Sequence, residues 1–102
     1  SAHQYAGEYK SAIARAKRVL LAAGFAWSKT TGRYYPYNNE QKTTYGVRVT
    51  RVGCSNTVSL SVWGDYRAEA SAERRELQGR ALAALRVAGL PFDDRGWLLC
   101  IR

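Results

Sequence analysis

The sequence predicts an α+β fold in which two helices pack on one face of a small antiparallel sheet, in the order α-β-(β)-β-β-α-β. Two segments carry apolar residues every three or four positions, which is the spacing of one helix face. Between them the apolar period falls to two, which is the spacing of a strand. The chain of 102 residues has room for one hydrophobic core. We therefore expect a single α+β domain over residues 9–102, preceded by a flexible segment, 1–8, whose first residues could be a cloning remnant.

The two helices are expected over residues 9–23 and 71–88. The apolar stripe of the first comprises Tyr9, Ala12, Ile13, Ala16, Leu20 and Ala23, and that of the second comprises Leu77, Ala81, Ala84, Leu85 and Ala88. Gly24 and Gly89 follow these stripes and are expected to end the helices in the left-handed conformation. Ser71 is a suitable N-cap for the second helix, with Asp65 as an earlier alternative start.

The strands are expected mainly between the helices. Residues 47–52 and 58–62 alternate apolar and polar side chains on either side of a turn at 53–56, which predicts an antiparallel hairpin. Residues 25–29 and 33–37 can form a smaller hairpin around Gly32, although Pro36 restricts its second half to an edge strand or loop. The run 97–101 predicts a terminal strand, preceded by a turn at Asp93 and Asp94.

The residues that enzymes commonly use are sparse, so we expect a non-catalytic protein without a cofactor or metal ion. The single histidine, His3, lies outside the predicted domain and offers no general base to a core nucleophile. Cys54 and Cys100 have no neighbouring metal ligands in the sequence, and we expect free thiols in a reducing compartment, with one bridge between them as the alternative. The longest uncharged apolar run, 19–27, is too short to span a bilayer.

Positive charge is concentrated in the first half of the chain. The net charge of the whole chain is +8, of which residues 1–51 carry +7, from nine Lys and Arg against two Glu. Such self-repulsion favours a polyanionic partner, most commonly nucleic acid. A basic solvated face without a specific ligand explains the same charge.

Aromatic residues lie among these cations. Residues 27–39 contain four aromatic side chains, two cations and no acid, a combination that holds single-stranded or looped nucleic acid through stacking and phosphate contacts. Trp27 is expected in the core, and alternation directs Tyr35 to the face opposite Tyr34 and Tyr37. The candidate nucleic-acid-binding residues are Lys29, Arg33, Tyr34, Tyr35, Tyr37, Lys42, Tyr45 and Arg48.

The sequence thus predicts a small, basic, cytoplasmic nucleic-acid-binding domain that uses its Lys/Arg-rich and Tyr-rich N-terminal half. DNA and RNA, single and double strands, and monomer and homodimer all remain open. The abundance of arginine over lysine is compatible with a GC-rich bacterial or phage genome. The alternative is a protein-binding adaptor or inhibitor, encoded by a phage or mobile element, that grips an acidic protein partner with the same Tyr/Arg surface. No membrane partner is expected.

Overall fold

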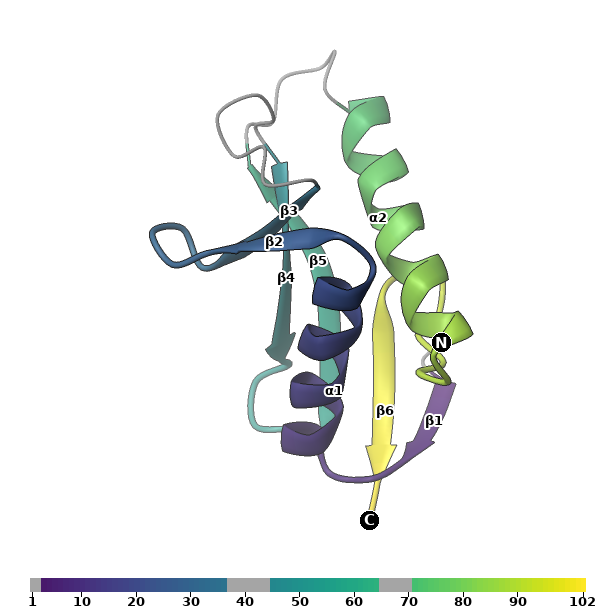
Figure 1. The fold of residues 1–102 in the computed structure, drawn as a ribbon. Coiled ribbons are helices and arrows are strands. Elements are labelled where there is room, and N and C mark those ends of the chain that lie inside the picture. The colour runs from purple at the N-terminus through teal and green to yellow at the C-terminus, as the bar shows by residue number, and fades with distance from the viewer. Residues whose placement is uncertain (1–2, 37–44, 65–70) are drawn as a thin grey trace.

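A computed structural model describes residues 3–36, 45–64 and 71–102, which form two helices and a six-stranded sheet (Figure 1). The predicted α+β class is confirmed. In chain order the elements are β1 (His3–Ala6), α1 (Tyr9–Ala22), β2 (Phe25–Ser28), β3 (Arg33–Pro36), β4 (Tyr45–Arg51), β5 (Thr57–Gly64), α2 (Ser71–Val87) and β6 (Trp97–Ile101).

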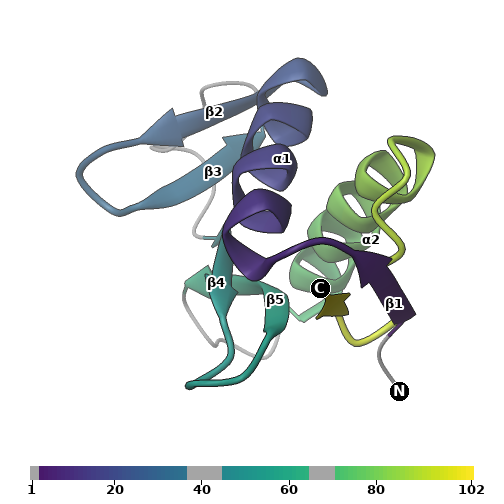
Figure 2. The same ribbon diagram turned by 90° about the horizontal axis from the view of Figure 1, so that it is seen from below.

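The sheet has the strand order β1-β6-β5-β4-β3-β2. Every neighbouring pair is antiparallel except β1 and β6, which run parallel, so the sheet is mixed rather than purely antiparallel. The sheet curves around the two helices, which lie together on its inner side (Figure 2). One sheet face is therefore buried under α1 and α2, and the other faces outward.

Strand β1 was not predicted. His3–Ala6 lies within the segment 1–8 that was expected to be flexible, and it pairs with β6, so that Tyr5 stands opposite Cys100. The N–H of Gly7 extends the contact by donating to the carbonyl of Ile101 at 2.6 Å. A four-residue strand carries little periodicity of its own, and its partner lies at the opposite end of the chain.

Helix α1 follows the predicted stripe closely. Ala12, Ala16 and Leu20 are fully buried, and small alanine side chains allow the helix to approach the sheet. Its first N–H, that of Tyr9, donates to the side-chain Oδ1 of Asn56 at 3.1 Å, so a residue distant in sequence caps the helix. Gly24 has φ of 99°, as expected for a residue that ends a helix.

Helix α2 ends by the same device. Gly89 has φ of 86°, and the N–H of Leu90 returns to the carbonyl of Leu85 at 2.9 Å, which is the bond of a Schellman C-cap. Leu77, Ala81 and Leu85 of the predicted stripe are buried. The alternative start at Asp65 lies outside the described residues.

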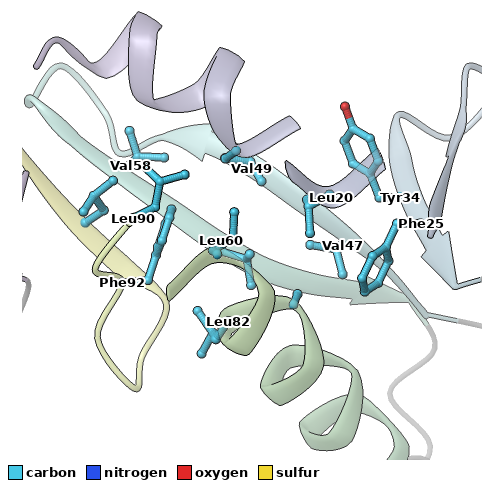
Figure 3. Close-up of a cluster of buried hydrophobic side chains, with 14 of the residues drawn as sticks. Leu20, Phe25, Tyr34, Val47, Val49, Val58, Leu60, Leu82, Leu90 and Phe92 are labelled. Carbon is cyan, nitrogen blue, oxygen red and sulfur yellow. The ribbon is translucent and has the colours of Figure 1, made fainter. Parts of the chain in front are cut away.

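The β4–β5 hairpin is the centre of the core. Its register places Val47 opposite Val62 and Val49 opposite Leu60. The side chains of Val47, Val49 and Leu60 lie in the core between this hairpin and the helices (Figure 3). The core continues through Phe25, Tyr34, Val58, Leu82, Leu90 and Phe92. Strict alternation sends the intervening residues of β4 and β5 to the outward face.

The β2–β3 hairpin joins the rest of the sheet through β3. Its two strands pair along their length, and in the described residues β3 pairs with β4 through Tyr34 and Val47. Beyond that contact the hairpin projects away from β4 (Figure 1). Pro36 is the last described residue of β3 and pairs with Phe25, and β3 lies between β2 and β4, so the expectation of an edge strand is wrong and β2 forms the edge.

The turn before β6 is organised by the Asp93 carboxylate, as predicted. Its Oδ1 accepts hydrogen bonds from the backbone N–H groups of Arg95 at 2.9 Å and Trp97 at 3.0 Å. Burial by itself raises the pKa of the Asp93 carboxyl, the two backbone hydrogen bonds and the positive charge of the amino terminus lower it, and the net result is a pKa below its usual range. The carboxylate form therefore stabilises the folded state.

Replacing Asp93 with Ala should cost about 1–3 kcal/mol at neutral pH, because two backbone donors lose their acceptor. A folded pKa below the unfolded one means that this stabilisation is complete above the unfolded pKa of about 4 and is lost as the pH falls through the folded value. Urea unfolding of wild type and variant should thus converge in acid. Asp94→Ala, which removes only the exposed pair with Arg86 at 2.9 Å, should cost less. Equal losses in both variants would contradict this account.

Candidate functional site

The outward face of the sheet, called the open face below, carries side chains that take no part in the core. Among the described residues, neither helix lies on this face, since both pack against the other one (Figure 2). The register of β4, β5 and β6 places a mixed set of side chains here, namely Arg48, Thr50, Thr57, Ser59, Ser61, Trp63, Trp97 and Leu99. The open face therefore combines hydroxyl, cationic and aromatic groups.

Trp63 and Arg48 form the first aromatic–cation pair on the open face. The Arg48 guanidinium carbon lies 5.1 Å from the centroid of the Trp63 ring, within range of a cation–π interaction. The indole Nε1–H donates to Ser61 Oγ at 2.7 Å, which fixes the ring orientation. Trp63 remains 42% exposed, so part of the ring is accessible to a ligand.

Trp97 supplies a second exposed ring at 43% exposure. It pairs across the sheet with Ser59, which lies four residues before Trp63 on β5. With a rise of about 3.4 Å per residue and about 4.8 Å between strands, the Cα atoms of the two tryptophans are about 14 Å apart. The two rings are thus separate contact points on one surface.

Gly46 brings the β3 side chains close to β4. A Cβ atom at this position would lie 2.6 Å from Arg33 Cβ, closer than real Cβ contacts, and 3.0 Å from Tyr35 Cζ, which is a tight contact. The missing side chain therefore admits Arg33 and Tyr35 onto β4. The Arg33 Nε is buried and has no hydrogen-bond partner in the described part of the chain. An acceptor brought by a ligand would satisfy it.

The electrostatics of the strands are one-sided. The six strands that the structure describes contain no aspartate or glutamate, whereas Arg33, Arg48 and Arg51 lie on β3 and β4. Arg51 is engaged locally, because it donates to the carbonyls of Ser55 and Cys54 at 2.6 and 2.8 Å. Arg33 and Arg48 therefore give the open face its positive charge.

The structure places the predicted binding residues in different environments. Tyr34, Tyr35 and Tyr45 are each at most 4% exposed, so their rings are not accessible for stacking. Burial also raises the pKa of the Tyr34 hydroxyl. Tyr34 and Tyr35 do point to opposite faces, as alternation predicts. Arg33 and Arg48 belong to the open face, Lys29 is exposed in the β2–β3 turn, and Tyr37 and Lys42 lie outside the described residues.

Trp27 was expected in the core, and this prediction is wrong. The side chain is 46% exposed. It shares the helix-side face of β2 with Phe25, but the β2–β3 hairpin projects away from the rest of the sheet (Figure 1). Phe25 is consequently buried, whereas Trp27 has only a partial cover.

The exposed tryptophans Trp63 and Trp97 are the binding candidates that sequence reasoning missed. The signal was present for Trp63, which alternates with the apolar Val58, Leu60 and Val62 and so belongs to the outward side of its strand. Trp97 alternates in the same way with Leu98. The predicted Tyr34, Tyr35 and Tyr45 are buried instead, whereas these two tryptophan rings are exposed.

Other chemistry is limited in the described residues. They contain no group of three or more His, Cys, Asp or Glu side chains arranged to hold a metal ion. Cys54 is free and exposed, and Cys100 is free and buried, with a thiol pKa raised by that burial. In this part of the chain, neither helix has the length and hydropathy needed to cross a membrane.

Comparison with protein-family models, with curated proteins and with solved structures gives no match to this chain. Its function is therefore inferred from the geometry and chemistry of the open face.

Gly46→Ala should destabilise the fold by about 1–3 kcal/mol, because a methyl group displaces Arg33 and Tyr35 from β4. Gly79→Ala is the matched control. Gly79 lies in α2 with open space around its Cα, so the same change should stabilise by about 0.5–1 kcal/mol through helix propensity. Chemical denaturation measures both. The two substitutions should change the free energy of unfolding in opposite directions. If Gly46→Ala leaves the free energy of unfolding unchanged, the β3–β4 contact is looser than described.

Proposed function

We propose that this protein is a non-catalytic nucleic-acid-binding domain that holds a single strand on the open face of its sheet. The observation that carries this proposal is the joint exposure of Trp63 and Trp97 beside Arg33 and Arg48 on strands that contain no acid. Exposed rings stack with bases, and neighbouring cations bind phosphates. The hydroxyl groups between the rings add further donors for phosphate oxygens.

The spacing of the rings supports a single strand. About 14 Å corresponds to about four nucleotides at 3.4 Å per stacked base, and to fewer when the strand is extended. In a duplex the base faces are covered by their neighbours, so Trp63 and Trp97 could reach them only after unpairing. On a paired duplex, Arg33 and Arg48 would still contact phosphates, but the two tryptophan rings would contact no base. The open face therefore favours unpaired bases of DNA or RNA.

The alternative proposal, a protein-binding adaptor, draws on the same exposed Trp and Arg side chains, which are also typical of protein interfaces. The charge of the described strands favours nucleic acid over a protein partner. These strands carry arginines but no acidic residues, whereas a surface that binds another protein usually carries both cations and acids. The free Cys54 and Cys100 are compatible with a reducing compartment such as the cytoplasm.

The first test is binding of labelled oligonucleotides at increasing salt. If three to five cations contact phosphates, log affinity for a single strand should fall with log salt at a slope of about −2 to −3.5. Arg48→Gln should weaken binding and reduce the slope magnitude by about 0.7. Arg75→Gln removes the same charge from the exposed side of α2 and should change neither the affinity nor the salt slope. Absence of binding to any single strand at about 50 mM salt would refute the proposal.

The second test concerns stacking. Trp63→Leu and Trp97→Leu should each weaken single-strand binding by about 1–3 kcal/mol, with the salt slope unchanged because no charge is altered. Both side chains are more than 40% exposed, so the unfolding transitions should remain close to that of wild type. Tyr34→Leu is the contrasting change, since it removes a buried ring and should lower stability. Unaltered binding in both folded tryptophan variants would exclude a stacking surface.

A further inference from the structure

A notch lies between the projecting β2–β3 hairpin and strand β4. In the described residues β3 pairs with β4 through Tyr34 and Val47, and toward its own turn the hairpin projects away from β4 (Figure 1). The space between them is a hollow of about 230 Å³, lined by Lys17 of α1, Trp27 and Tyr34 of the hairpin, and Arg48, Val49 and Thr50 of β4. Pockets for drug-sized ligands measure roughly 300–1,000 Å³, so this notch has room for one small group.

An aromatic wall and a cation face each other in the notch. The Trp27 ring is packed against Tyr34, with 4.8 Å between ring centroids and 48° between ring planes. Lys17 Nζ lies 5.7 Å from the centroid of Trp27. Trp27 is 46% exposed despite these contacts. A planar group can stack on the ring while an attached anion contacts the ammonium group.

The main chain of β4 adds hydrogen-bonding groups. The N–H of Val52 donates to Thr57 at 2.8 Å, which marks these residues as a hydrogen-bonded pair of the β4–β5 ladder. In an antiparallel ladder every second residue forms such a pair, so Thr50 also directs its N–H and C=O groups to β5. Val49, which lies between two such positions, directs its N–H and C=O groups to the opposite side, toward the notch. In the described residues, β3 does not extend far enough to pair with Val49. One donor and one acceptor therefore face the hollow.

We propose that the notch is a subsite for one nucleotide, with its base against Trp27, the polar edge of the base at the Val49 main chain, and its phosphate on Lys17. The proposal rests on the proposed function: Arg48 lines the notch and also lies on the open face, so a strand bound on that face would pass beside β4 to reach Trp27 and Lys17 on the helix side of the sheet. The nucleotide is one of the strand bound on that face. Its base would be bound by hydrogen bonds and not only by stacking, which adds base preference at one position.

The test combines base removal with a change of Trp27. Oligothymidylate and oligouridylate of about ten residues are prepared with one abasic site moved along the strand. In wild type, loss of the base that occupies the notch should weaken binding about five- to hundredfold. In Trp27→Leu the same abasic oligonucleotide should bind as well as the intact one. At all other positions the two proteins should show equal losses.

Two further variants control for folding and charge. Trp27→Phe keeps an aromatic ring, so the abasic site at the notch position should weaken its binding nearly as much as it weakens wild-type binding. Thermal unfolding of this variant shows whether the hairpin is intact. Lys17→Gln should reduce the salt-slope magnitude by about 0.7, whereas Arg18→Gln, which removes the adjacent exposed cation of α1, should not.

Each outcome decides one of the two proposals. If wild type binds single strands but Trp27→Leu shows the same losses at every abasic position, the notch is not a nucleotide subsite. The proposal for the open face would be unaffected by that result. Wild type that binds neither oligonucleotide would refute the proposed function itself. Equal slopes for Lys17→Gln and Arg18→Gln would remove Lys17 from the subsite.

Discussion

The pairing of β4 with β5 is the constraint on which the rest of the structure depends. It is the longest ladder of the sheet, running from Tyr45–Gly64 to Arg51–Val58, and both helices pack on its inner face. Strand β3 attaches to its one side and β6 to the other. Because side chains alternate along a strand, burying valine and leucine under the helices forces the intervening residues outward. The alternation that builds the core therefore also assembles the open face.

Local patterns in the sequence predicted most of this fold. The helix stripes, the glycine helix ends and the β4–β5 hairpin depend on contacts within short segments, and all are present. The parallel strand β1 and the sheet order depend on pairings across the whole chain, which periodicity does not record. The site was only partly predictable for a related reason. Arg33 and Arg48 were identified from charge, whereas exposure of Trp27 depends on how far the hairpin projects beyond the pairing of Tyr34 with Val47.

Contacts between cations and aromatic rings recur in the described residues and serve two purposes. Arg15 lies 5.8 Å from the Tyr5 ring centroid while donating to the Tyr5 hydroxyl and to the carbonyl of Ala88, so it ties β1, α1 and the end of α2 together. The pairs Arg48–Trp63 and Lys17–Trp27 instead lie at exposed rings. An exposed pair contributes about 0.5–1 kcal/mol, too little to account for the fold. Its larger effect is to limit the positions of a flexible cation before a ligand arrives, which reduces the entropy lost on binding.

The distribution of charge gives the two proposed sites a common basis. Helix α2 mixes Glu73 and Glu76 with its arginines, but α1 and all six strands contain no acid. The unbalanced positive charge thus covers α1 on one side and β3 and β4 on the other, and the notch lies where these two regions meet. A polyanion approaching the molecule is attracted toward this side before any contact forms. A strand bound as proposed would pass from the open face beside Arg48 to Lys17, so both proposed sites lie within the same positive field.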